Sequence, residues 1–130
     1  MYKRQDKDII FKGNDGGSVI TALTLDMSAA GAATFNDNVT AYSDERLKDN
    51  IETLTDGLDK VEQLRGVTYT RDERENIGVI AQEVEKILPE IVLTADDEMG
   101  TKSVDYSRLT AVLNEAVKDL SARVKELEGK

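Results

Sequence analysis

The feature that most constrains the fold is a stripe of apolar side chains that recurs every seven residues near the C-terminal end. The stripe consists of Tyr106, Leu109, Leu113, Ala116, Leu120 and Leu127. Asp105 precedes it as a suitable N-cap, and Arg123 interrupts it. Seven-residue spacing with flanking Glu and Lys is typical of a coiled coil, and we expect one helix over residues 106–127. So short a repeat also fits a long amphipathic helix on the core of its own domain, and both interpretations stay open.

Residues 1–42 have a different character, since they are rich in Gly, Ala, Ser and Thr. Their β-branched runs predict short strands at residues 8–11 and 18–27, with a turn at 13–17 and one or two more strands over 33–35 and 38–41. So few large side chains cannot stabilise an isolated sheet. The strands therefore form either a small meander packed on the rest of the chain or the end of a fibrous stalk in which three chains share one core. Because Met1 begins this segment abruptly, we expect a fragment rather than a natural terminus.

The remaining residues, 43–130, carry most of the acidic excess and the single proline, Pro89. We place a domain boundary between Tyr42 and Ser43, which gives the domains 1–42 and 43–130. The pattern of the second domain predicts a mainly helical fold with small hairpins, and the whole chain belongs to the α+β class. The expected elements are a helix at 54–64, a strand at 67–70, a charged turn at 71–76, a helix at 81–88 and a hairpin over 91–104.

Composition excludes several classes of function. The formal charge of −9 argues against nucleic acid or an anionic membrane as a partner, because both require clustered Lys and Arg. The absence of cysteine and histidine removes thiolate nucleophiles, the Ser-His-Asp triad and the usual zinc sites. The acidic residues 96–98 lack the ligand pattern of a calcium loop and are expected at a hydrated hairpin tip. We therefore predict no metal, no cofactor and no membrane span, and any catalysis depends on Ser, Thr, Lys, Asp, Glu or Tyr.

The segment after Tyr42 has two interpretations. On spacing alone, Ser43 is a helix N-cap, and Asp44 and Glu45 lie favourably in the first helical turn. The surrounding sequence favours another interpretation, because three blocks occur in the same order as in a known family. The blocks are residues 43–51 (SDERLKDNI), 78–85 (GVIAQEVE) with 88–90 (LPE), and 104–109 (VDYSRL).

These blocks resemble the C-terminal intramolecular chaperone, auto-processing domain of phage tailspikes and tail fibres, peptidase family S74. The resemblance covers residues 43 to about 127, and residues 1–42 then resemble the end of the preceding stalk. It implies a homotrimer, joined by a trimeric coiled coil along the apolar stripe, that holds its own stalk chains in register. It also implies assembly in the host cytoplasm, a stalk that stays in the virion, and release of the chaperone by cleavage between Tyr42 and Ser43.

The resemblance further implies a Ser-Lys dyad that acts once, in cis. Ser43 is the family's nucleophile and Lys48 its partner, the general base. A lysine in water has a pKa of about 10.4, so the base must lose its water to serve. Some members also depend on a histidine, which this chain lacks. The competing hypotheses are an uncleaved distal tip that binds a host receptor and, less specifically, coiled-coil oligomerisation of an unrelated protein.

Overall fold

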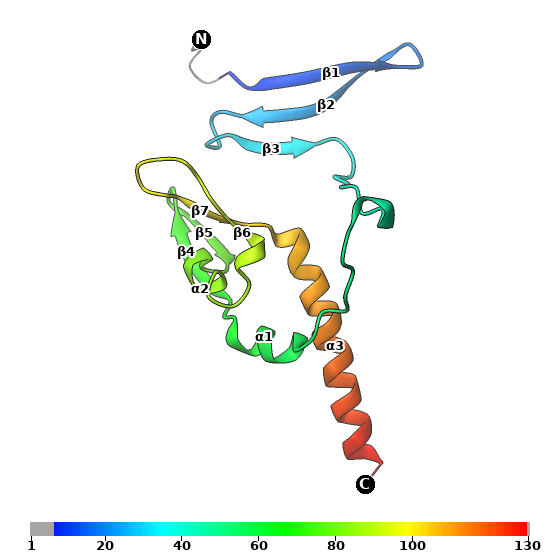
Figure 1. Cartoon of the computed structure of the whole chain (residues 1–130). Helices are drawn as coiled ribbons and strands as arrows, with labels where there is room; N and C mark the ends of the chain where they lie inside the picture. The colour runs from blue at the N-terminus through cyan, green and yellow to red at the C-terminus, as the bar shows by residue number, and fades with distance from the viewer. Residues whose placement is uncertain (1–6, 130) are drawn as a thin grey trace. The chain divides into compact units, whose positions relative to one another are not determined.

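The computed structural model describes residues 7–129 and divides into two compact units, Met1–Asn50 and Ile51–Lys130 (Figure 1). The α+β class is confirmed, since the chain contains small antiparallel sheets and a long C-terminal helix. The division groups residues 43–50 with the β-rich unit, and the boundary between Tyr42 and Ser43 stays a prediction. Within residues 7–129, no helix combines the length and apolar character that crossing a bilayer requires.

The first unit is an antiparallel sheet in the order β1 (Ile9–Asp15), β2 (Ser18–Asp26) and β3 (Ala32–Phe35). Gly16 and Gly17 join β1 to β2 with positive φ angles of 56° and 95°, as a two-residue hairpin turn requires. These three strands confirm the sequence prediction. Of the one or two strands expected over 33–35 and 38–41, only the first forms, because the chain bends after β3 and residues 38–41 pair with no described strand.

This sheet has no core of its own. None of the described residues of the unit is buried; Leu23 and Leu25 are partly buried, and several other large apolar side chains are about half exposed or more. Ile9 is 50% exposed, Phe11 52% and Val19 71%. The three strands therefore bury too little apolar surface to be stable alone.

The second unit begins with α1 (Gly57–Gln63) and ends with α3 (Tyr106–Glu128). Between them lie β4 (Val67–Arg71), β5 (Arg74–Gly78), α2 (Ala81–Val84), the 3₁₀ turn η2 (Pro89–Ile91), β6 (Val92–Thr94) and β7 (Lys102–Val104). The hairpin of β6 and β7 confirms the expected one. The turn expected at 71–76 is wrong, because residues 74–78 pair with β4 and leave only two turn residues. The predicted helices at 54–64 and 81–88 are shorter than expected.

A small core holds this unit together. Val84, Leu88, Ile91 and Val112 are buried and pack against one another. Partly buried side chains from several elements surround them: Leu54, Val61, Leu64, Val79, Ile87, Val92, Val104 and Leu109. The core therefore fixes α3 against α2, η2 and the β6–β7 hairpin.

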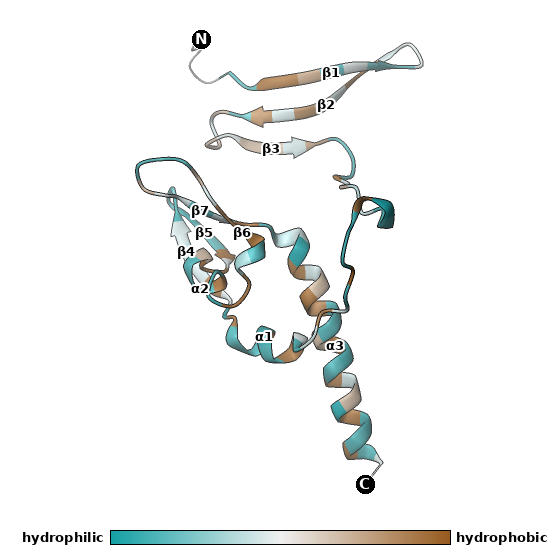
Figure 2. Cartoon of the chain, viewed as in Figure 1, coloured by the Kyte–Doolittle hydropathy of each residue, from teal (hydrophilic) through white to brown (hydrophobic). Residues whose placement is uncertain are grey.

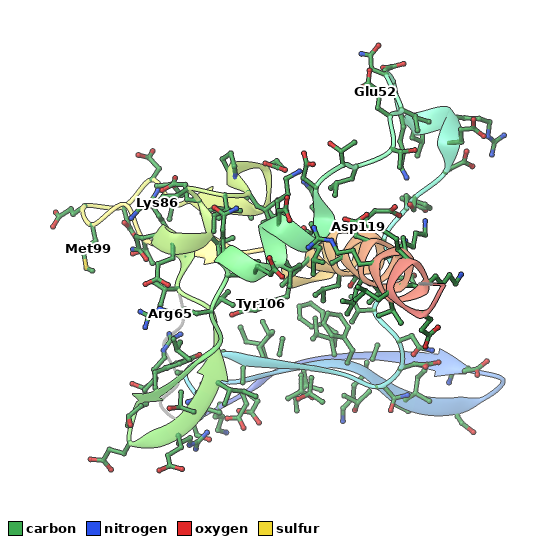
Figure 3. The ribbon with its side chains drawn as sticks, turned by 90° about the horizontal axis from the view of Figure 1, so that it is seen from below. Glu52, Arg65, Lys86, Met99, Tyr106 and Asp119 are labelled. Atoms are coloured by element: carbon green, nitrogen blue, oxygen red, sulfur yellow. The ribbon has the colours of Figure 1, made fainter. Side chains whose placement is uncertain are left out.

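The helices α1 and α3 approach each other closely at Gly57. A Cβ added to Gly57, the first residue of α1, would lie 2.6 Å from the backbone nitrogen of Ala116 in α3. At the same end of α1, the Leu58 backbone N–H donates to Oδ2 of Asp119, 3.1 Å away. Figure 3 places Asp119 on α3. A carboxylate from α3 thus satisfies an unpaired donor at the start of α1.

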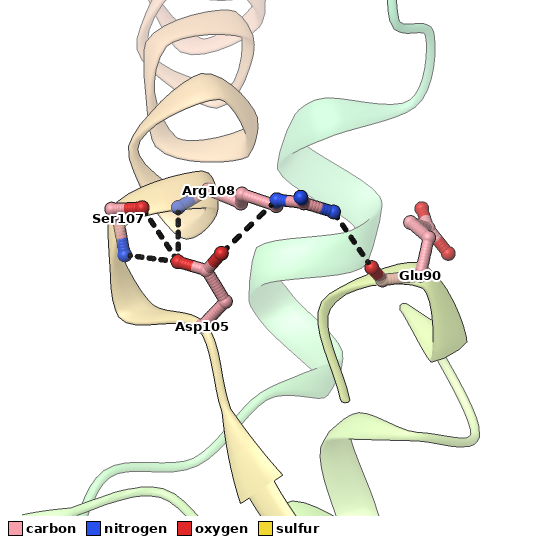
Figure 4. Close-up of polar contacts among 4 residues, drawn as sticks. All are labelled: Glu90, Asp105, Ser107 and Arg108. Carbon is pink, nitrogen blue, oxygen red and sulfur yellow. Dashed lines mark hydrogen bonds and ion pairs between the residues drawn. The ribbon is translucent and has the colours of Figure 1, made fainter. Parts of the chain in front are cut away.

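The start of α3 is fixed by Asp105, which confirms the predicted N-cap (Figure 4). Its carboxylate accepts from the backbone N–H groups of Ser107 and Arg108 at 3.1 and 3.3 Å. The Ser107 hydroxyl, which also donates to this carboxylate, is the main cause that lowers the pKa of Asp105. Arg108 pairs with Asp105 at 3.0 Å and donates to the Glu90 carbonyl at 3.4 Å, which ties the helix start to η2.

Different faces of α3 have different surroundings. Ala116 is only 5% exposed, and Leu109 packs on the core, so these members of the stripe lie against their own domain. The other members stay about half exposed or more: Tyr106, Leu113, Leu120 and Leu127. Val117 and Val124 lie between them and are also exposed, so an apolar seam continues along the helix (Figure 2). Its pairing with other chains stays a prediction.

Candidate active site

The structure brings the two predicted catalytic side chains together. Nζ of Lys48 donates a hydrogen bond to Oγ of Ser43 over 2.8 Å. Both residues are exposed, and the Tyr42 residue that precedes them is 97% exposed. The peptide bond between Tyr42 and Ser43 therefore lies in an accessible segment beside a hydroxyl and an amine.

A short turn produces this proximity. The 3₁₀ turn η1 (Glu45–Leu47) follows Asp44, and Leu47 N–H donates to the Asp44 carbonyl at 3.1 Å. Lys48 then returns to extended backbone, and its side chain reaches Ser43. The interpretation of Ser43 as the N-cap is wrong, because Asp44 is the cap and the Ser43 hydroxyl contacts Lys48 instead.

Asp44 also forms a fork of hydrogen bonds with Arg46. Its Oδ1 accepts from the Arg46 backbone N–H at 2.9 Å and from Nε at 3.0 Å, while its Oδ2 accepts from Nη2 at 2.6 Å. The side-chain hydrogen bond from Arg46 is the main cause that lowers the pKa of Asp44. Sequence reasoning missed this pair, although an Asp two residues before an Arg at the start of a turn is a usable signal.

The arrangement is chemically that of a nucleophile beside a base. A hydroxyl within hydrogen-bond distance of an amine can pass its proton to that amine as it attacks a carbonyl. Loss of water favours the neutral form of a lysine, so Lys48 requires a less hydrated environment than this exposed turn to act as the base. Within residues 7–129, no three acidic side chains gather as a metal site would need.

Comparison with known proteins agrees with this geometry. Residues 43–93 match the model of the peptidase S74 family, described as "Chaperone of endosialidase". The chain therefore contains a region similar to the peptidase S74 family. The matched region of the S74 domain begins at Ser43, and the predicted resemblance is confirmed. The match is to a family of peptidases, and self-cleavage by a Ser-Lys dyad in this chain stays a prediction.

Curated relatives of the chain are phage tail fibre proteins. The chain is 44% identical over 102 residues to the long tail fiber protein Gp37 of Enterobacteria phage K3 and, equally, to that of phage T2. These matches cover 72% of the chain but only 8% of each relative. Gp37 of phage M1 is 36% identical over 104 residues, covering 72% of the chain and 41% of the relative.

A solved structure has a similar fold. It is the carboxy-terminal domain of the bacteriophage T5 L-shaped tail fiber with its intramolecular chaperone domain. The TM-score is 0.50 at 11% identity, and the match covers 95% of this chain and 45% of the T5 chain. At this identity the likeness concerns the fold alone.

Proposed function

We propose that the chain is the C-terminal part of a phage tail fibre in which an S74 domain assembles three chains and then cuts itself off. The domains are the stalk end, residues 1–42, and the chaperone, residues 43–130. The observation that carries the proposal is the 2.8 Å contact between Lys48 Nζ and Ser43 Oγ at the first residue of the family match. The relatives are named as tail fibre proteins, which supports a fibre stalk as the part that this domain assembles.

Cleavage follows from the residues in the turn. Oγ of Ser43 attacks the carbonyl carbon of Tyr42, and Lys48 takes the hydroxyl proton as general base. Lys48 returns that proton to the amide nitrogen of Ser43, which leaves as an amine, so Tyr42 is held as an ester on Oγ. Water then hydrolyses the ester, which leaves a carboxylate on Tyr42 and a free amino group on Ser43. The reaction occurs once per chain.

Two exposed surfaces support assembly with copies of the same chain. The β1–β2–β3 sheet has no buried residue among those described, and three such sheets together can form a core. The seam on α3 offers Leu113, Leu120 and Leu127 at one heptad position and Val117 and Val124 at the other. Three stalk chains pair slowly because their contacts are far apart in sequence, and a helical trimer close by lowers this entropic cost.

The proposal is tested by intact mass and denaturing gels. The wild-type chain should yield two fragments that end at Tyr42 and begin at Ser43. Ser43→Ala should remain whole, and so should Lys48→Arg, since a guanidinium stays protonated and cannot act as a base. Ser18→Ala and Lys12→Arg, exposed in the β1–β2 hairpin, are matched controls that should cleave normally.

Other outcomes contradict parts of the proposal. A wild-type chain that stays whole as a trimer favours a permanent distal tip that binds a receptor. Cleavage of Ser43→Ala at the same bond would exclude Ser43 as the nucleophile. Cleavage of Lys48→Arg at the wild-type rate would reduce Lys48 to a structural partner of Ser43.

A further inference from the structure

We infer that Asp44 and Arg46 are positioning residues for self-cleavage, because their fork of hydrogen bonds holds the turn that brings Lys48 to Ser43. The inference rests on the proposed function and extends it beyond the nucleophile and the base. The side chains of Asp44 and Arg46 bond to each other, and the dyad forms a separate hydrogen bond, so we assign both residues an action through the dyad.

The turn has little else to hold it. The three-residue η1 contains no buried side chain, so apolar packing does not fix it. A 3₁₀ segment of this length is not stable in water through its backbone hydrogen bonds alone. The side-chain hydrogen bonds recorded within residues 43–48 are those between Asp44 and Arg46 and the Lys48–Ser43 bond itself. Rotation about this turn would carry the lysine amine away from the hydroxyl.

The geometry of the fork requires arginine. Nε and Nη2 of Arg46 donate to different oxygens of the Asp44 carboxylate at 3.0 and 2.6 Å. A planar guanidinium makes such paired bonds, whereas a lysine ammonium is a point charge on a flexible stem. The third bond, from the Arg46 backbone N–H, makes Asp44 the cap of η1. The Asp44 carboxylate therefore binds both the backbone N–H and the guanidinium of Arg46.

The fork also balances charge beside the base. The pKa of Asp44 is lowered mainly by the side-chain hydrogen bond from Arg46 and, in smaller measure, by the positive charge of Lys48. An unpaired carboxylate near Lys48 would favour the ammonium form and oppose its action as a base. The other ionisable neighbours of Lys48 in this segment are Glu45 and Asp49. Arg46 offsets the charge of Asp44, because its guanidinium donates to both oxygens of the Asp44 carboxylate.

The experiment compares variants of the whole chain by the rate of self-cleavage across pH. Arg46→Gln should slow cleavage about tenfold or more, since misplacement of a catalytic group by about 1 Å can cost a hundredfold. Its remaining activity should shift to higher pH, because the unpaired Asp44 keeps Lys48 protonated. Asp44→Asn combined with Arg46→Gln should return the pH profile toward wild type, although the rate stays low. Arg46→Lys should cleave slowly but keep the wild-type pH profile, because lysine keeps the positive charge and cannot form the paired hydrogen bonds of the fork.

The control is Arg71→Gln, which removes an exposed arginine whose Asp72 partner is 3.6 Å away, and it should cleave like wild type. Sedimentation of every sample shows whether assembly is intact. Arg46→Gln and Arg46→Lys with wild-type mass and slow cleavage support the inference. The inference is overturned if both variants cleave with wild-type rates and pH profiles. It is also overturned if cleavage is lost only in samples whose assembly has dissociated. Failure of the wild-type chain to cleave overturns the proposed function instead.

Discussion

Replacing Gly57 by alanine should destabilise the helical unit, although alanine is the better helix former. The added Cβ would lie 2.6 Å from the Ala116 nitrogen and 2.8 Å from the Glu115 carbonyl carbon, so α1 and α3 must move apart. Overpacking of this kind costs about 1–3 kcal/mol. The gain in helix propensity is at most about 1 kcal/mol. If alanine gains its full helix propensity, the steric term leaves a net loss of up to about 2 kcal/mol.

The assay is thermal or urea unfolding followed by far-UV circular dichroism at one fixed chain concentration, because assembly makes the midpoint depend on concentration. A loss of 1 kcal/mol corresponds to a fall in Tm of about 4–8 °C for a unit of this size. Gly66→Ala is the matched control. No atom lies within 4 Å of a Cβ added at Gly66, so that variant should keep the wild-type midpoint.

Equal stability of Gly57→Ala and wild type would refute the reasoning. It would mean that α1 can shift along α3 without cost, and that the bond between Leu58 N–H and Asp119 does not fix the start of α1. An equal fall in the unfolding midpoint of Gly57→Ala and Gly66→Ala would mean that the substitution acts elsewhere than at the contact between α1 and α3, for example on the unfolded chain.

Three further predictions follow from burial, the exposed seam and the cap. Leu88→Ala should cost about 2–5 kcal/mol in the free energy of unfolding, because Leu88 is fully buried. Leu113→Asp with Leu120→Asp should dissociate the proposed trimer in sedimentation and abolish cleavage in the same samples, since like charges would meet along the seam. The pKa of Asp105 is lowered in the folded state, so its stabilisation is present above the unfolded pKa and lost as pH falls through the folded one. An acid titration should therefore destabilise wild type more than Asp105→Ala.

Each of these predictions has a control. Leu93 is 61% exposed, and Leu93→Ala should change stability by no more than about 0.5 kcal/mol. Ala111→Asp with Ala122→Asp adds the same charge to exposed positions on another face of α3 and should leave the trimer intact. Dissociation by this control pair would show that charge on α3, rather than the seam, matters. Equal loss of stability at acid pH in wild type and Asp105→Ala would show that the Asp105 cap does not cause the pH dependence.

The sequence predicted elements whose signals are local. The β1–β2 hairpin follows from β-branched residues around Gly16 and Gly17, and α3 follows from its cap and its apolar spacing. β5 escaped prediction because its residues are mostly charged or polar and its turn, Asp72 and Glu73, holds positive φ without glycine. Pairing with β4 decides this strand, and such pairing leaves no periodic signal in an exposed segment.

The candidate site was predictable only in part. The identities of Ser43 and Lys48 came from the resemblance, since a serine five residues before a lysine carries no specific signal. The Asp44–Arg46 fork depends on polar contacts in an exposed turn, where apolar periodicity is uninformative. The close approach of Gly57 to α3 arises from tertiary docking between segments far apart in the sequence.

On the proposed function, the exposure of the dyad in a single chain has a role in timing. Lys48 is exposed in the single chain, and a lysine must lose its water to act as a base, so an unassembled chain should cleave itself poorly. Burial of the turn by neighbouring chains would remove that water and release the base. Early cleavage would separate a stalk sheet without a core from the helices that align it. Cleavage that waits for burial keeps the chaperone attached until three chains are in register. Its subsequent loss then makes unfolding kinetically difficult to reverse.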